Sequence, residues 1–570
     1  MKNKLSFFAM FMAALLINSC GSLNKMKENA KTINYKVTPS PLEVKGGQVE
    51  VTVSATYPAK FFNKKAVVEV TPVLKYQGGE EAYPSKKFQG ESVKENNDVI
   101  KYTEGGSKTV STGSIPFKKE MMVSDLVIRA KGTLGKQTAD FPELKIADGV
   151  IATELLVVND PRPIMVGDKY VRVTNDKVVA DIKYVINKAD VRPSELKKED
   201  IMNLKSSLKS ISADSSKKVT SVELSAYASP DGPMDLNEKL AEKRKTSAND
   251  FLKKDLKSDK LSLGDDIFKY LVTAEDWDGF KALMEKSNIK DKELVLRVLS
   301  MYSDPAVREK EIKNISEAYS EIKEQILPEL RRSKFTVNYD VTGKSDDQLI
   351  ALATSTPDSL SLEELLYSAT LTKDLNQKLA IYQAASAKYP SDFRAKNDAG
   401  YVLVKLNRID EAKAAFEAAK GVEDNNVVKN NLGVCALMQG DQAKAEELFT
   451  AAMGAGDVVN YNLGIIKIMQ GKYADAMNYF GNTCEVNNAL AKLLAKENDD
   501  AMTTLNCIKD ESALVYYLKA IVGARTQNTD LLFSNLRTAC GKSAELKANA
   551  AKDLEFAKYF EDATFKSIVQ

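Results

Sequence analysis

The sequence predicts a multidomain protein in which an all-β domain is followed by an α+β domain and an all-α region, and three patterns favour this fold class. Val49, Val51 and Val53 alternate with polar residues, as in a half-buried strand. A strand, a tight turn and a helix are expected in succession between residues 222 and 252. In the last third of the chain, small and aromatic residues recur at a fixed interval.

The composition excludes several classes of function. The 570 residues include 81 basic and 79 acidic side chains, so the net charge of +2 creates no strong field to attract nucleic acid. Histidine is absent, which excludes Ser-His-Asp and Cys-His nucleophilic catalysis, His-ligated zinc and imidazole acid/base chemistry. Since no motif indicates a pair of catalytic carboxylates, we expect a protein that is not an enzyme, with no cofactor and no metal site.

The amino terminus has the features of a bacterial export signal. A basic start is followed by the apolar run 5–17, which is too short to span a bilayer as a helix. The next residues, Ile17-Asn18-Ser19-Cys20, resemble a lipobox. The resemblance implies a signal peptide over residues 1–19, lipidation of Cys20 and a tether over residues 20–33. The alternative is an ordinary secretory signal with an accidental cysteine.

The residues that follow Cys20 predict where such a lipoprotein would reside. Residues 21–26 lack the acidic cluster that resembles the surface-export signal of lipoproteins in the Bacteroidetes. The resemblance therefore implies a Bacteroidetes-type outer-membrane lipoprotein that is anchored to the membrane by lipid and faces the periplasm.

Four further cysteines lie in the carboxy-terminal part of the chain, and they allow three disulfide pairings. No CxxC pair is present, so neither a thioredoxin-like motif nor a zinc ribbon is indicated. We expect buried free thiols rather than disulfides, although the pairing remains open. The four residues are Cys435, Cys484, Cys507 and Cys540.

Residues 34–158 are expected to form the all-β domain. The alternating run 49–57 is followed by further short apolar runs at 66–70 and 126–130, and glycine pairs separate several of them. Short strands with glycine-rich turns favour an Ig-like sandwich. We interpret this domain as a spacer or docking module.

The α+β domain is expected over residues 170–343. Its pattern is Tyr227-x-Ser229-x-x-Gly232, followed by Asn237, Leu240 and Arg244 on a helix. This order resembles the core of the OmpA-like peptidoglycan-binding domain. An Arg331-Arg332 pair before an alternating strand resembles the end of the same family pattern. The intervening range 253–326 is longer than the family's usual connection and is expected to be a helical insertion.

The family resemblance implies a clamp for the zwitterionic diaminopimelate side chain of peptidoglycan. The carboxylate-binding arginine falls on Arg244 and the family's asparagine on Asn237. The ammonium-binding aspartate falls on the uncharged Ser229, and Asp231 in the same turn is the alternative acid. Arg244 has a second interpretation as a solvated helix-face residue in a run of basic residues.

Residues 345–570 are expected to form helical repeats with a carboxy-terminal cap. Gly433 and Phe449 reappear 31 positions later as Gly464 and Phe480. Such spacing resembles the tetratricopeptide repeat, or TPR, whose stacked helix pairs imply a concave groove for peptides or proteins. The alternative is a purely structural array. Candidate groove residues are Asn397, Tyr401, Lys405, Asn430, Asn431, Tyr461 and Asn462.

Together these features predict a lipoprotein that links the outer membrane to peptidoglycan and scaffolds envelope proteins through its repeats. The alternative is a component of an assembly or secretion machinery, in which the OmpA-like domain has lost peptidoglycan binding and binds protein. Ser229 in place of an acid favours this alternative.

Overall fold

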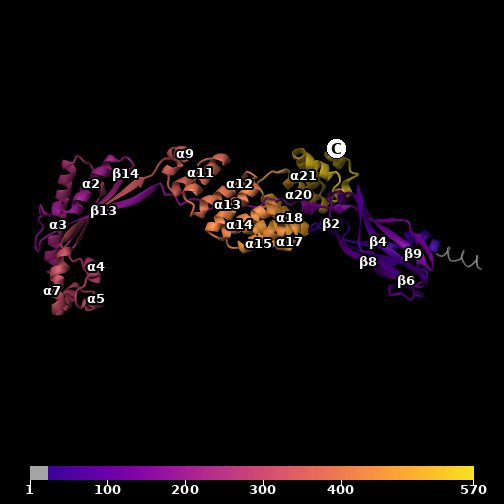
Figure 1. Cartoon of the computed structure of the whole chain (residues 1–570), viewed down its shortest axis with the longest axis horizontal. Helices are drawn as coiled ribbons and strands as arrows, with labels where there is room; N and C mark the ends of the chain where they lie inside the picture. The colour runs from indigo at the N-terminus through magenta and orange to yellow at the C-terminus, as the bar shows by residue number, and fades with distance from the viewer. Residues whose placement is uncertain (1–22) are drawn as a thin grey trace, which may run out of the picture. The chain divides into compact units, whose positions relative to one another are not determined.

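The computed structural model describes residues 23–570 (Figure 1). The predicted signal peptide and Cys20 lie outside this range. The chain forms two compact units. The first joins the residues up to Gly167 with Lys373–Gln570, and the second is Asp168–Thr372, which is therefore inserted into the first.

The amino-terminal part of the first unit consists of two sheets around a common core, as the alternating runs predicted. Val49, Val51 and Val53 point into this core. One sheet contains β1 (Asn34–Thr38), β3 (Gln48–Tyr57), β2 (Leu42–Lys45), β12 (Val150–Ile151) and β8 (Gly106–Pro116). The other contains β10 (Gln137–Asp140), β9 (Ser124–Leu134), β4 (Ala66–Tyr76), β6 (Lys86–Gly90), β7 (Asp98–Ile100), β11 (Leu144–Asp148) and β5 (Gly79–Ala82).

The carboxy-terminal part of the first unit is a succession of antiparallel helix pairs, consistent with a TPR solenoid (Figure 1). The pairs are α12 (Phe393–Lys405) and α13 (Ile409–Val422), α14 (Asn426–Met438) and α15 (Gln442–Ala451), α16 (Asp457–Met469) and α17 (Tyr473–Phe480), α18 (Val486–Leu494) and α19 (Asn498–Cys507), and α20 (Ala513–Arg525) and α21 (Thr529–Lys542). The remaining helices are α11 (Leu375–Lys388) before the first pair and α22 (Ala544–Ala550), η7 (Leu554–Tyr559) and α23 (Ala563–Val569) after the last.

The recurring glycines and phenylalanines explain the close approach of these helices. A Cβ atom on Gly433 would lie 2.7 Å from the ring of Phe449, and one on Gly464 would lie 2.5 Å from the ring of Phe480. Each phenylalanine ring therefore packs directly on the backbone of the preceding helix, where any side chain would collide with it. The prediction of repeated helix pairs is confirmed.

One disulfide bond forms between Cys484, just before α18, and Cys507 at the end of α19. Cys435 and Cys540 are free and buried. The expectation of free thiols was therefore right for one pair and wrong for the other, because the ends of these two helices bring Cys484 and Cys507 to a Cα separation of 5.5 Å.

The sandwich is joined to the repeats through η3 (Thr153–Leu156). Glu154, which is 4% exposed, accepts hydrogen bonds from the backbone N–H groups of Gly46 and Gly47 at 2.8 and 3.0 Å. Its carboxylate also accepts a 2.6 Å bond from the Tyr473 hydroxyl on α17. These contacts fix the point from which the chain continues across the repeats.

The second unit contains a four-stranded sheet in the order β13 (Val173–Lys183), β16 (Arg332–Thr342), β14 (Lys217–Tyr227) and β15 (Phe268–Thr273). The helices α2 (Glu199–Ala213) and α3 (Met234–Ser258) pack on the sheet around a shared apolar core (Figure 1). β15 lies within the range expected to be helical. It follows α3 and pairs in parallel with β14, which makes it part of the sheet rather than of the insertion.

The helices after β15 have an apolar core of their own. They are α4 (Trp277–Lys286), α5 (Lys292–Met301), α6 (Pro305–Asn314), α7 (Ser316–Gln325) and α8 (Leu327–Leu330). Two further helices, α9 (Asp346–Ser355) and α10 (Leu362–Thr370), fall in the second unit by their contacts. Among the described residues, 23–570, no helix is both long and apolar enough to cross a membrane.

Candidate functional site: the strap-binding face of the repeats

A row of buried polar side chains lies on the even-numbered helices of the repeats. α12, α14, α16 and α18 present them at equivalent positions near their amino-terminal ends, and each is at most 8% exposed. Buried amides and carboxylates need hydrogen-bonding partners, so this face requires a ligand or a neighbouring chain segment. These residues bind an extended segment of chain, the strap, and we call them the strap-binding face: Asn397, Asp398, Asn430, Asn431, Tyr461, Asn462 and Asn487.

The partner is a segment of the same chain. Residues 158–167, which we call the strap, run in an irregular extended conformation from the end of η3 to the beginning of the second unit. At its start, the Val158 N–H donates to Asn487 Oδ1 at 2.9 Å, and Asn487 Nδ2 donates to the Val158 carbonyl at 2.8 Å. The asparagine thus satisfies both main-chain groups of one strap residue.

The same two-way bonding recurs at the centre of the strap. The Arg162 N–H donates to Asn462 Oδ1 at 2.7 Å, and its carbonyl accepts from Asn462 and Asn430 at 3.0 and 3.1 Å. The Ile164 N–H donates to Asn431 Oδ1 at 2.7 Å, and the Asn431 amide returns a bond of 2.7 Å to its carbonyl.

The strap ends on a carboxylate. Asp398 accepts from the backbone N–H groups of Val166 and Gly167 at 2.9 and 3.2 Å. Burial raises the pKa of this carboxyl, while these backbone donors and Asn397 favour its ionised form. Asp398 therefore holds the last strap residues through main-chain bonds alone.

The bonded strap residues alternate with prolines. Arg162 and Ile164 are held through their main chains, while Pro161 and Pro163, which have no N–H to offer, are buried between them. An extended chain presents its main-chain groups to one side at every second residue, so prolines at the intervening positions cost no hydrogen bonds. The sequence of the strap matches the spacing of the asparagines.

Side-chain contacts add selectivity at one point. The Arg162 guanidinium donates two hydrogen bonds, of 2.8 and 2.9 Å, to Glu485 and stacks 3.5 Å from the centre of the Tyr461 ring. The Tyr461 hydroxyl donates to Asp160 at 2.6 Å. The bonds to Glu485 raise the pKa of Arg162, and burial raises that of Asp160. This part of the face thus contacts an arginine and an acid that lie two positions apart in the strap.

The asparagines also bond to one another across the helices. Asn462 Nδ2 donates to Asn430 Oδ1 at 3.0 Å, and Asn431 Nδ2 donates to Asn397 Oδ1 at 2.8 Å. These bonds fix the orientation of each amide before it meets the strap. The face is therefore a connected polar network rather than a set of independent contacts.

The structure brings together five of the seven residues expected to line a groove: Asn397, Asn430, Asn431, Tyr461 and Asn462. Tyr401 and Lys405 lie further along α12, where the Lys405 ammonium is 5.6 Å from the Tyr401 ring centre. Sequence reasoning missed Asp398, Glu485 and Asn487. Asn487 had a detectable signal, because the pair Asn487-Asn488 on α18 repeats the pair Asn430-Asn431 on α14.

The second candidate site lies at the carboxyl end of β14 in the second unit. Arg244 on α3 is 0% exposed, and its guanidinium donates to the backbone carbonyls of Tyr227, Lys188 and Val185 at 2.8, 3.1 and 3.5 Å. Burial lowers the pKa of Arg244 to about 10. The interpretation of Arg244 as a solvated residue is wrong, because it lies on the buried stripe of α3 with Ala248.

The other predicted residues of this site bond to each other. Asp231 accepts a hydrogen bond from the Arg331 guanidinium at 3.0 Å and another from the Ser229 hydroxyl. Arg331 Nε also donates to the Ser229 hydroxyl oxygen at 3.2 Å. Asn237 donates to the carbonyls of Ser229 and Gly232 at 3.1 and 3.0 Å, which holds the turn closed. The site thus contains two arginines and one acid whose bonding groups are engaged within the protein.

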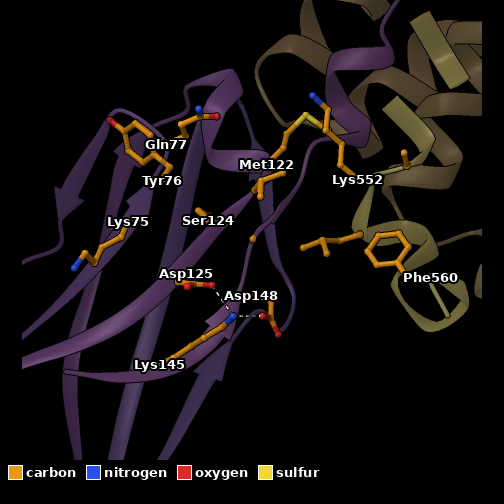
Figure 2. A pocket seen from close by; sticks show the side chains of 14 residues that line it. Lys75, Tyr76, Gln77, Met122, Ser124, Asp125, Lys145, Asp148, Lys552 and Phe560 are labelled. Atoms are coloured by element: carbon orange, nitrogen blue, oxygen red, sulfur yellow. Dashed lines mark ion pairs between the residues drawn. The ribbon is translucent and has the colours of Figure 1, made fainter. Parts of the chain in front are cut away.

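A cavity of about 570 Å³ lies between the sandwich and the carboxy-terminal helices (Figure 2). The Lys145 ammonium forms ion pairs with Asp125 and Asp148, each at 2.6 Å. Figure 2 shows these three residues on the sandwich side of the cavity and Phe560 on the helical side. Because these charges already form ion pairs with each other, the cavity offers no free pair of carboxylates. Within the described part of the chain, no three His, Cys, Asp or Glu side chains cluster as metal ligands do.

No known family model matches the chain, and no curated protein matches its sequence. Solved structures resemble parts of it at low identity. A tetratricopeptide repeat protein from Parabacteroides merdae is 12% identical over 39% of this chain and 89% of its own, with a TM-score of 0.28. PilF of Pseudomonas aeruginosa is 17% identical over 38% and 98%, with a TM-score of 0.29.

A third solved structure, yeast Tom70, is 12% identical over 58% of this chain and 77% of its own, with a TM-score of 0.27. At such low identities and TM-scores, the assignment of helical repeats rests on the helix pairs and on the packing of phenylalanine against glycine described above.

Proposed function

We propose that the protein is a non-enzymatic scaffold of the bacterial cell envelope, which collects partner proteins through its helical repeats. The observation that carries this proposal is the strap-binding face, whose buried asparagines hold the main chain of an extended segment at every second residue. A surface built in this way is suited to binding an extended polypeptide.

Two features support a location outside the cytoplasm. The lipobox-like residues before Cys20 indicate export and lipidation. The disulfide between Cys484 and Cys507 is typical of an oxidising compartment such as the periplasm. We therefore propose a lipid-anchored protein of the outer membrane that faces the periplasm.

We propose that the OmpA-like domain of the second unit serves as a protein-interaction module in an assembly or secretion machinery. A clamp for a zwitterion needs a free cationic group and a free acid. Here Arg244 is fully buried on three backbone carbonyls, and Asp231 is paired with Arg331. The arrangement supports the proposal that the domain keeps the OmpA-like fold but no longer binds peptidoglycan.

Peptidoglycan tethering is the second candidate. One observation favours it: Arg244, Arg331 and Asp231 are close enough to interact electrostatically, so both signs of charge occur at one place. The test is co-sedimentation of residues 21–570 with purified peptidoglycan sacculi. Sedimentation of the parent but not of Arg244→Ala or Asp231→Ala would establish tethering, and a parent that stays in the supernatant would exclude it.

The scaffold proposal is tested by crosslinking in intact cells that express the full chain with an affinity tag. We expect discrete crosslinked species that contain envelope proteins and that are lost when Cys20→Ser prevents anchoring. If the full chain is recovered only uncrosslinked, while a known envelope complex in the same cells is captured, the proposal is wrong.

A further inference from the structure

The strap is held mostly by bonds that do not depend on its sequence. Val158, Arg162, Ile164 and Val166 are bound through backbone N–H groups, and three of them also through backbone carbonyls. Any extended segment with main-chain groups at the same spacing can make these bonds. The face is therefore not restricted to its present occupant.

The two ends of the strap are attached differently. At its start, the preceding η3 is fixed by Glu154 to both the sandwich and α17. At its end, Met165 and Val166 are 38% and 37% exposed, and Asp398 alone holds the N–H groups of Val166 and Gly167. Detachment from the Gly167 end leaves the start of the strap and the sandwich in place.

We propose that the strap is a latch that closes the partner-binding face of the repeats. A partner binds by replacing residues 162–167 on Asn397, Asp398, Asn431 and Asn462, and the strap returns when the partner leaves. This inference rests on the proposed scaffold function and adds its regulation: in the latched state the repeats do not bind partners on this face.

The strap also indicates what kind of partner segment fits. The segment is extended, has prolines at alternate positions where no N–H is needed, and carries an arginine that reaches Glu485 and the Tyr461 ring. Partner proteins should therefore contain an exposed, unstructured stretch of the type Pro-Arg-Pro followed by an aliphatic residue.

A tethered strap competes strongly with a free peptide. Segments joined by short linkers reach effective concentrations of about 1 mM, so a peptide of micromolar affinity is expected to bind the latched chain at least ~100-fold more weakly than the open chain. This difference is the measurable property of the latch.

The experiment uses the full soluble chain, residues 21–570, and a fluorescent peptide with the sequence of residues 157–169. In the open variant, Arg162, Ile164 and Val166 are each replaced by proline, which removes the backbone N–H groups that donate to Asn462, Asn431 and Asp398. We expect saturable binding of the peptide to the open variant by anisotropy, and binding to the parent at least ~100-fold weaker. Asn462→Ala in the open variant should abolish binding, whereas Gln442→Ala, on the exposed side of α15, should leave it unchanged.

Three results would overturn the latch. The open variant could lose cooperative unfolding, which would make the strap a permanent part of the fold. It could remain folded, by circular dichroism and melting temperature, and bind no peptide. Parent and open variant could also bind the peptide equally, which would mean that the strap does not close the face.

The latch and the scaffold fail in different ways. If parent and open variant capture the same envelope partners equally in intact cells, the latch is wrong and the scaffold stands. If neither form captures a partner, the scaffold proposal is wrong whatever the peptide does.

Discussion

Arg162 and Asn462, which lie 300 positions apart in the sequence, exchange two hydrogen bonds through the backbone of one and the side chain of the other. The backbone N–H of Arg162 donates at 2.7 Å and its carbonyl accepts at 3.0 Å. Asn462 is 0% exposed, so its amide has no water as an alternative partner. This pair joins the strap to the middle of the repeats.

Replacement of Asn462 by alanine should destabilise the first unit. The variant leaves the Arg162 N–H of the strap without its acceptor, and it leaves Asn430 Oδ1 without the bond that Asn462 donates. Each unsatisfied buried group costs about 1–3 kcal/mol. We expect a loss of about 2–3 kcal/mol in the free energy of unfolding, measured by urea denaturation. The control is Asn478→Ala in the neighbouring helix, where an exposed substitution should cost less than about 0.5 kcal/mol. Equal losses in the two variants would contradict the role of Asn462.

Replacement of Gly464 by alanine should disrupt a helix contact. The added Cβ would lie 2.5 Å from the Phe480 ring, and overpacking of this kind typically costs about 1–3 kcal/mol. Gly421→Ala in α13 is the matched control, since nothing lies within 4 Å of its Cβ position. The control should be neutral or slightly stabilising, because alanine favours helix more than glycine. If thermal unfolding gives Gly464→Ala the same melting temperature as the parent, the packing of Phe480 on this backbone is wrong.

Thiol titration should report the cysteine states directly. Cys435 and Cys540 are buried, and burial raises the pKa of the Cys435 thiol to about 12, so a thiol reagent at pH 8 should react with neither in the folded soluble chain. Unfolding without reductant should release these two thiols, and unfolding with reductant should release Cys484 and Cys507 as well. Four reactive thiols without reductant would show that the disulfide is absent.

The stability of the first unit should depend on the ionisation of Asp553. Burial raises the pKa of this carboxyl to about 6, although Tyr517 and the Glu555 N–H bond to it. Between about pH 4 and pH 6 the folded chain therefore binds more protons than the unfolded chain, and the contribution of Asp553 to the unfolding free energy falls as the pH rises. The fall amounts to at most about 3 kcal/mol.

The Asp553→Asn variant provides the measurement. The difference in unfolding free energy between parent and variant should decrease from pH 4 to pH 7, because only the parent loses stability through this carboxyl. A difference that is constant or increases over this range would show that the carboxyl is not held in its protonated form.

The repeats could be predicted from the sequence because they depend on local spacing. Gly433 and Phe449, like Gly464 and Phe480, lie 16 positions apart, and the structure places each phenylalanine on its glycine. The first helices of the pairs, and the asparagines on them, follow from the same register. Most of the strap-binding face was therefore found without coordinates.

The occupant of this face could not be predicted from the sequence. The strap has no hydrophobic period, and its Pro161 and Pro163 are typical of a linker. Its contacts join residues 300 positions apart, and a single sequence contains no signal for such a pairing. Arg244 is different, because its spacing from Ala241 and Ala248 was a signal in the sequence for the buried side of the helix, and the interpretation as a solvated residue overlooked it.

Hydrogen exchange of the strap tests the central claim most directly. The backbone amides of Arg162, Ile164 and Val166 should exchange slowly in the full soluble chain, at rates comparable to those of the repeat helices, and Asn431→Ala should accelerate exchange at Ile164. Protection of these amides in the parent and its loss in the variant are the predicted result. Exchange of the strap in the parent at the rate of an exposed loop would contradict the account, because the asparagines of the repeats would then have another partner.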